Sequence, residues 1–172
     1  MKHLTKTLLL VALLGAAACT NAGRFGPGDG AGAGGAGVGG ALTGGPEDPR
    51  SAAYFQQTIG DRVLFAVDQS SLSPEAQMIL DGQAAWLATN SDYLAVIEGH
   101  ADEQGTREYN IALGARRANA VRDYLVSRGV APDRLRFVSY GKERPVEVCS
   151  EEACYAKNRR AVTVIAAGGL TG

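Results

Sequence analysis

Arg117 is the residue whose place in the sequence first needs a chemical explanation. Around it, apolar and small residues recur at helical spacing and define one buried helix face at about 100° per residue: Gly114, Ala118, Val121 and Leu125. Arg117 lies on the same side, between Leu113 and Val121. A guanidinium stays protonated in proteins, so its burial requires a nearby anion and hydrogen-bond acceptors. The spacing therefore predicts a buried cation with a negatively charged partner.

Asp102 is the nearest candidate for that partner in the sequence. It belongs to residues 98–105, a turn expected to leave a strand and lead into the helix of Arg117. An Asp102–Arg117 pair is either a structural salt bridge or a clamp for a zwitterion, with the carboxylate holding an ammonium and the guanidinium holding a carboxylate. Asn110, two turns earlier on the same helix line, could add amide hydrogen bonds. Spacing alone leaves both interpretations open.

Catalytic chemistry has few candidate groups in this chain. His100 is the only histidine beyond His3, and a metal hydrolase would need more ligands. A Ser–His–Asp site would need an exposed nucleophile, which no elbow motif marks. His100 is better interpreted as a strand-end residue that hydrogen-bonds the turn. We therefore predict a protein that is not an enzyme and uses no cofactor or metal.

The elements that must position these groups follow a β-α-β-α-β-β order. Apolar runs predict strands at 63–67, 93–98, 135–140 and 161–167. One helix begins after Ser73 as N-cap with Pro74 at its first position, and a second occupies most of 106–128, ending before Gly129. This pattern favours an α+β fold with the helices packed on one face of a small mixed sheet. The folded domain is expected at 51–167, followed by a short tail at 168–172.

The first fifty residues are typical of an exported and tethered protein. Residues 1–18 combine two lysines, a short apolar run and small residues, which predicts a signal peptide that is too short to span a bilayer. The small residues before Cys19 resemble a bacterial lipobox, although Ala16 stands where leucine is usual; an ordinary signal peptide is the alternative. Residues 19–50 are rich in Gly and Ala and predict a flexible linker, about 30 Å from end to end. The formal net charge of −1 argues against a nucleic-acid partner.

Cys149 and Cys154 form a second group of interest. If Cys19 carries lipid, these two cysteines remain as a pair in an oxidising compartment, within a polar stretch predicted to be a solvated loop. A small disulfide loop is the simplest interpretation. A metal-binding pair and two free thiols are the alternatives.

Four sequence motifs together carry a resemblance to a known family. They are EGHADEQGTREYN at 98–110, LGARRA at 113–118, SYGKERP at 139–145 and KNRRA at 157–161. This combination closely resembles the peptidoglycan-associated lipoproteins of the Tol–Pal system, within the wider family of OmpA-like domains. The resemblance covers about residues 55–166.

The resemblance implies binding of the diaminopimelate in the stem peptide of peptidoglycan. Asp102 falls on the family position that holds the ligand ammonium, and Arg117 on the one that holds its carboxylate. Asn110 matches a supporting asparagine, and Asp68 a second aspartate at the end of the first strand. The family often has Phe-Asp-Phe-Asp at that strand end, whereas this chain has an alanine at position 66, so any role of the first aspartate is absent.

The resemblance also implies a location and partners. It indicates an outer membrane lipoprotein, anchored through acylated Cys19, whose periplasmic domain links that membrane to peptidoglycan and supports envelope integrity and constriction during cell division. The implied protein partners are TolB and TolA. The alternatives are another wall-binding protein with an OmpA-like domain, such as a flagellar stator subunit, and a purely structural periplasmic domain.

Overall fold

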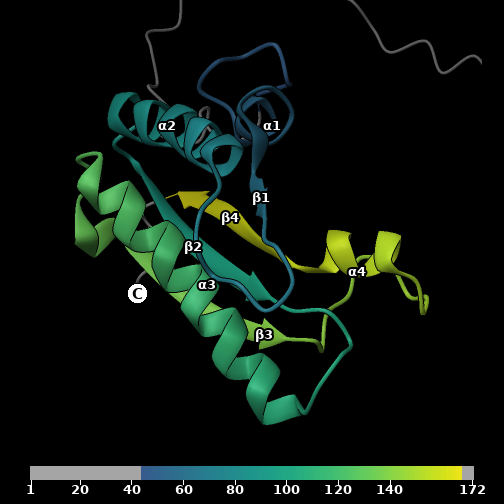
Figure 1. Cartoon of the computed structure of the whole chain (residues 1–172). Coiled ribbons are helices and arrows are strands. Elements are labelled where there is room, and N and C mark those ends of the chain that lie inside the picture. Colours follow the sequence, from purple (N-terminus) through teal and green to yellow (C-terminus); the bar gives the residue numbers. More distant parts are fainter. Residues whose placement is uncertain (1–43, 168–172) are drawn as a thin grey trace, which may run out of the picture. The chain divides into compact units, whose positions relative to one another are not determined.

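Four strands form one open mixed sheet in the computed structural model, which describes residues 44–167 (Figure 1). The strands are β1 (Arg62–Leu64), β2 (Tyr93–His100), β3 (Leu135–Gly141) and β4 (Arg160–Ala167), in the order β1-β4-β2-β3. The predicted signal peptide at 1–18, Cys19, the linker up to residue 43 and the tail at 168–172 lie outside the described residues. The predicted α+β class, with a small mixed sheet, is confirmed.

The pairing of the strands brings four strand ends to one edge of the sheet. β2 and β3 are parallel, and β4 runs antiparallel to both β1 and β2. Leu64 at the end of β1 pairs with Arg160 at the start of β4, and His100 at the end of β2 pairs with Gly141 at the end of β3. The loops that follow β1 and β2 therefore start beside the segment that leads into β4.

Two long helices, α2 (Pro74–Thr89) and α3 (Arg107–Ser127), cover one face of the sheet (Figure 1). Their predicted starts are confirmed, because the Ser73 and Thr106 hydroxyls accept hydrogen bonds from the main-chain N–H of Ala76 and Tyr109. Buried side chains of both helices and of the inward strand positions form the core, among them Leu80, Leu87, Ile97, Val121 and Leu125. Among the described residues, no helix has the length and apolar character needed to cross a membrane.

Gly99 and Gly114 let α3 lie unusually close to β2. A Cβ built on Gly99 would lie 1.9 Å from the carbonyl oxygen of Gly114, and one built on Gly114 would lie 2.4 Å from Ser139 Oγ. Only glycine leaves room for this contact between two backbones. The contact fixes the first half of α3 against the end of β2, which places Asn110 and Arg117 beside the turn after His100.

Three helical segments were absent from the predicted order. These are α1 (Ala52–Tyr54) continued by the π-helical η2 (Phe55–Gly60), the 3-10 turn η3 (Pro132–Arg134), and α4 (Glu152–Asn158) between β3 and β4. Each is too short to show an apolar period in the sequence. Packing also begins before residue 51, since the Pro49 carbonyl accepts a hydrogen bond from Trp86 Nε1 at 2.7 Å.

The first strand is shorter than predicted and ends at Leu64. Phe65 still donates its main-chain N–H to the Arg159 carbonyl at 2.9 Å, but the chain then turns away from the sheet. The carbonyl of Ala66 accepts a hydrogen bond from Arg117 instead of a strand partner, and Asp68 adopts a φ of 59°. The predicted extension to residue 67 is wrong because side chains of α3 draw this segment into the site.

Candidate ligand-binding site

A small cavity opens at the edge where the strand ends meet. Its volume is about 260 Å³, and it lies between the loop after β1, the turn after β2 and the first turns of α3. The residues that line it are Val67, Asp68, Asp102, Gln104, Gly105, Tyr109, Asn110 and Leu113. Three of the four predicted ligand residues, Asp68, Asp102 and Asn110, are therefore brought together at one cavity.

Asp102 is held in a fixed orientation at this cavity. Its side chain is 11% exposed, and its Oδ1 accepts a hydrogen bond from the main-chain N–H of Gln104 at 3.1 Å. Its Oδ2 accepts a hydrogen bond from Arg159 Nη1, also at 3.1 Å. A carboxylate has about four acceptor positions, so Asp102 keeps capacity for a ligand donor.

Asn110 and Asp68 complete the polar wall of the cavity. Asn110 is buried, and its Nδ2 donates to the Gln104 carbonyl at 2.8 Å, which fixes the turn that carries Asp102. Asp68 has the left-handed backbone conformation noted above, and its Oδ1 accepts a hydrogen bond from the Tyr109 hydroxyl. A left-handed conformation is unfavourable for a residue other than glycine, and such strain occurs often at binding sites.

Arg117 is fully buried, as predicted, but its direct partners are three main-chain carbonyls. Its Nε donates to Gln69 O at 2.8 Å, Nη1 to His100 O at 2.8 Å, and Nη2 to Ala66 O at 3.2 Å. The guanidinium carbon also lies 5.2 Å from the centre of the Phe65 ring. The expected direct pair of Arg117 with Asp102 is therefore corrected, because Asp102 forms its ion pair with Arg159. Arg117 lies behind the cavity wall and does not line it.

The charge of Arg117 still depends on the acidic residues of the cavity. Burial lowers the pKa of Arg117 to about 10, while Asp102 and Asp68 act in the opposite direction. The side chain thus remains a cation at neutral pH, and the predicted negative neighbours are present at longer range. Buried between three carbonyls and near two carboxylates, it ties the loop after β1 to the end of β2.

Arg159 is the site residue that sequence reasoning missed. It lies between α4 and β4, is 4% exposed, and donates to Asp102, to Glu152 and to the Phe65 carbonyl. Its partner Asp102 is 57 residues away in the sequence, so no local period could connect them. The available signal was the adjacent pair Arg159 and Arg160 beside the predicted strand at 161–167, because arginines next to a buried strand need hydrogen-bond acceptors.

His100 lies under the turn and not in the cavity. It is 1% exposed, and burial lowers its pKa to about 4, with Arg160 and Arg144 adding to the effect. The imidazole is therefore neutral at physiological pH and shielded from solvent. Among the described residues, neither ring nitrogen has a hydrogen-bond partner, so the predicted hydrogen bond from His100 to the turn is wrong.

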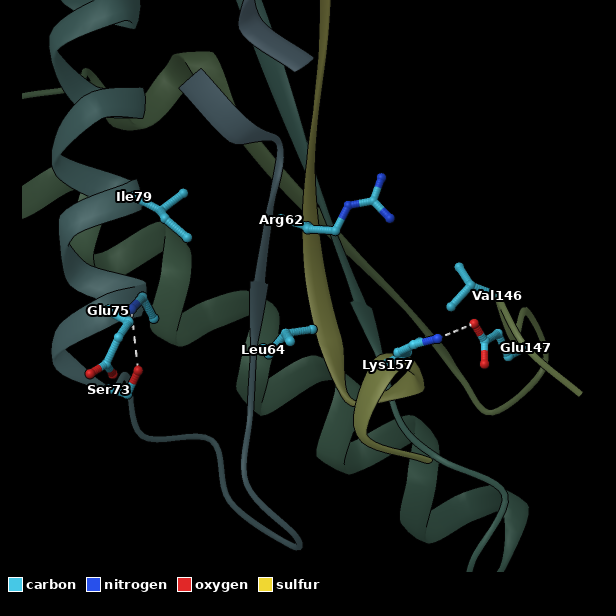
Figure 2. A pocket seen from close by; sticks show the side chains of 9 residues that line it. Arg62, Leu64, Ser73, Glu75, Ile79, Val146, Glu147 and Lys157 are labelled. Atoms are coloured by element: carbon cyan, nitrogen blue, oxygen red, sulfur yellow. Dashed lines mark hydrogen bonds and ion pairs between the residues drawn. The ribbon is translucent and has the colours of Figure 1, made fainter. Parts of the chain in front are cut away.

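A second, larger cavity of about 540 Å³ lies away from this site, between α2, β1 and the segment around α4. Figure 2 shows Ile79 and Glu75 on α2 on one side of β1, and Val146, Glu147 and Lys157 on the other. Its lining includes none of the predicted ligand residues, and its lysine is paired with Glu147. Size alone does not make it the better candidate, because its chemistry offers no convergent set of unpaired polar groups.

The remaining chemical features of the described chain are structural. A disulfide joins Cys149 to Cys154 and encloses the start of α4. Within residues 44–167, no group of three or more His, Cys, Asp or Glu side chains is arranged to hold a metal ion. The arrangement that remains is an acidic cavity backed by a buried cation, which suits a ligand that carries an ammonium group.

The fold and this cavity match a known class of domain. A family model described as the OmpA family matches residues 64–159. A peptidoglycan-associated lipoprotein of Rhizobium meliloti (strain 1021) is 51% identical over 162 residues, covering 94% of this chain and 88% of the relative. One of Mesorhizobium japonicum is 56% identical over 125 residues, covering 73% of this chain and 74% of the relative. The chain belongs to the OmpA family, as one of its peptidoglycan-associated lipoproteins.

Solved structures agree with this placement. The crystal structure of the peptidoglycan-associated lipoprotein from Burkholderia pseudomallei aligns with a TM-score of 0.63 at 38% identity, covering 71% of this chain and all of that chain. The C-terminal domain of Helicobacter pylori MotB aligns with a TM-score of 0.59 at 21% identity, which shows a shared fold only.

Proposed function

We propose that this protein is an outer membrane lipoprotein whose periplasmic domain binds peptidoglycan non-covalently through the cavity of Asp68, Asp102 and Asn110. The observation that carries the proposal is the fixed carboxylate of Asp102 at an acidic cavity. The names of the relatives, which describe peptidoglycan-associated lipoproteins, support it. The ligand is the diaminopimelate of the stem peptide, which has ammonium and carboxylate groups on an aliphatic chain.

Each part of this ligand has a matching group at the site. The ammonium would bind Asp102, with Asp68 adding negative charge, and the aliphatic chain would contact Val67 and Leu113. The carboxylate would be attracted by Arg117, which has five N–H donors and gives three of them to carbonyls. Direct contact with Arg117 requires a shift of the loop after β1, because the side chain is fully buried and does not line the cavity.

Binding is favoured over catalysis on physical grounds. The nearest imidazole, His100, is buried and neutral and lies outside the cavity lining, so it is poorly placed to transfer a proton to a ligand. The proposal therefore gives the domain the role of a tether. Lipid on Cys19 and the flexible linker would let it reach the wall from the membrane. Within the Tol–Pal system, TolB and TolA would be its protein partners, in envelope maintenance and in constriction of the outer membrane during division.

Sedimentation with purified peptidoglycan sacculi tests this function. Asp102→Asn keeps the size of the side chain and removes its charge, so we expect about tenfold weaker pull-down or more, since hydrogen bonds to charged groups contribute roughly 1.5–3 kcal/mol. Asp123→Asn is the matched control, because Asp123 is an exposed carboxylate on the same helix as Asn110, with its side chain 72% exposed.

The outcome separates a binding site from a structural pair. The proposed function is supported if Asp102→Asn keeps the melting temperature of the wild type but no longer sediments with sacculi, while Asp123→Asn still sediments. If Asp102→Asn sediments as well as the wild type, the site is misplaced. If the variant unfolds, Asp102 has the structural role that the sequence left open.

A further inference from the structure

A row of three charged side chains leads from the cavity to the disulfide loop. Arg159 Nη1 donates to Asp102 Oδ2 at 3.1 Å, and Arg159 Nη2 donates to Glu152 Oε1 on the other side of the same guanidinium. Glu152 Oε2 also lies 3.5 Å from Nη1. The guanidinium therefore bridges a carboxylate that faces the cavity and one that faces solvent, whose side chains are 11% and 65% exposed.

Glu152 and Arg159, which form one of these two ion pairs, lie at opposite ends of helix α4. Glu152 is its first residue, and Arg159 is its C-cap, whose main-chain N–H donates to the Tyr155 carbonyl at 3.0 Å. The two residues are seven positions apart, which places them on one helix face about two turns apart. Arg159 Nε is fixed as well, because it donates to the Phe65 carbonyl at 3.3 Å.

The disulfide closes a short loop that contains Glu152. Cys149 and Cys154 lie on either side of Glu152, and their Cα atoms are 6.1 Å apart. The start of a seven-residue helix would fray on its own, since short helices are marginal in water. A covalent link across that start keeps Glu152 in reach of Arg159.

We propose that Arg159 and Glu152 are positioning residues for the cavity, and that the Cys149–Cys154 disulfide holds Glu152 in this role. Arg159 orients Asp102, and Glu152 takes up part of the charge of Arg159, which leaves Asp102 able to attract a ligand ammonium. Burial acts to lower the pKa of Arg159, but hydrogen bonds with Glu152 and Asp102 outweigh it and the pKa is raised. The inference rests on the proposed function of the cavity.

The test measures affinity and site geometry in the full-length protein. The probe is the tripeptide L-Ala-γ-D-Glu-meso-diaminopimelate, and its affinity is measured by calorimetry. The position of Asp102 is followed separately through the amide NMR signal of Gln104, whose N–H donates to Asp102 Oδ1. The matched control is Glu147→Gln, which breaks the exposed pair with Lys157 next to the same helix.

Removing the charge of Glu152 is expected to change ligand binding in the cavity, whereas removing the charge of Glu147 is not. Glu152→Gln should weaken tripeptide binding about threefold, in the range of a partly exposed ion pair, and shift the Gln104 amide signal. Replacing both cysteines with serine should also weaken tripeptide binding and shift the Gln104 amide signal. Arg159→Gln should weaken binding about tenfold or more. Arg159→Lys should weaken it less, because lysine keeps the positive charge but lacks the several N–H donors of the planar guanidinium.

Each outcome decides one of the two proposals. If Glu152→Gln leaves both the affinity and the Gln104 signal as they are in Glu147→Gln, the positioning role is wrong. If the wild type does not bind the tripeptide, the proposed function fails, and the Gln104 signal still decides whether Glu152 positions Asp102. If Arg159→Gln does not fold, the exposed Glu152 and the cysteine pair keep the test decisive.

Discussion

The main chain of Gly114 in α3 lies directly against Gly99 in β2, and a Cβ on Gly114 would meet the Gly99 carbonyl oxygen at 2.8 Å. This contact presses the helix that carries Asn110 and Arg117 onto the strand that leads to Asp102. The site therefore depends on the absence of two side chains as much as on the presence of polar ones.

Alanine at position 114 is expected to destabilise the fold. The new Cβ would lie 2.4 Å from Ser139 Oγ and would force α3 away from the sheet, at a cost of about 2 kcal/mol in the free energy of unfolding. Gly82→Ala, in α2, is the matched control, since its Cβ would have only an ordinary contact with Ile59 at 3.5 Å. That variant should gain about 1 kcal/mol from helix propensity. Urea denaturation should show a lower free energy of unfolding for Gly114→Ala and a higher one for Gly82→Ala. An unchanged free energy of unfolding in Gly114→Ala would contradict the close packing.

Methionine at position 117 is expected to lower stability far more than methionine at position 116. Arg117→Met leaves the carbonyls of Ala66, Gln69 and His100 without their donor, and because each buried acceptor left without a partner costs about 1–3 kcal/mol, we expect a loss of about 3 kcal/mol or more. Arg116 is exposed on the same helix, so Arg116→Met should stay within about 0.5 kcal/mol of the wild type. Chemical denaturation compares the two. Equal stability of the variants would mean that Arg117 acts only on a ligand.

His100 should make the fold less stable in acid. Its pKa in the folded state is lowered to about 4 by burial, whereas an unfolded histidine titrates near 6.5, so the unfolded state binds more protons between these values. The stabilisation is present above about pH 6.5 and is lost as the pH falls towards 4, to a total of about 3 kcal/mol. Denaturation at pH 7 and pH 4.5 should show a smaller pH dependence for His100→Gln than for the wild type. Identical pH dependences would show that the imidazole is accessible to protons in the native state.

Cys19 is expected to carry the membrane anchor. Cys19→Ser should abolish incorporation of labelled palmitate and release the protein from the membrane fraction, because several acyl chains on one residue give stable attachment. Cys149→Ser is the control, since that cysteine is taken up by the disulfide. Palmitate incorporation that survives Cys19→Ser would place the lipid on another residue.

The comparison of Arg117 with Arg159 shows what the sequence could predict. The burial of Arg117 follows from a helical period, which depends on neighbours within two turns, and the structure confirms it. The partner of Asp102 is set by the order of strands in the sheet, which brings the start of β4 beside the end of β2. No local pattern contains that information, so the sequence predicted a cation in the site and assigned the ion pair to the wrong arginine.

The short helices show a second limit of the same kind. The sequence pattern predicts no helix at α4, because seven residues give less than two full repeats of a helical pattern. What stabilises α4 is the disulfide and the pair between Glu152 and Arg159, both of which are tertiary features. The class of fold, the main strands and both long helices needed no such information.

The place of β4 in the sheet has a consequence for biogenesis. This strand is the last of the described elements, yet it lies between β1 and β2 and joins the two halves of the sheet. Because synthesis proceeds from the N-terminus, the sheet cannot be completed until residues 160–167 have been made. A premature stop just before residue 160 would leave β1 without its strand partner and would separate it from β2 and β3.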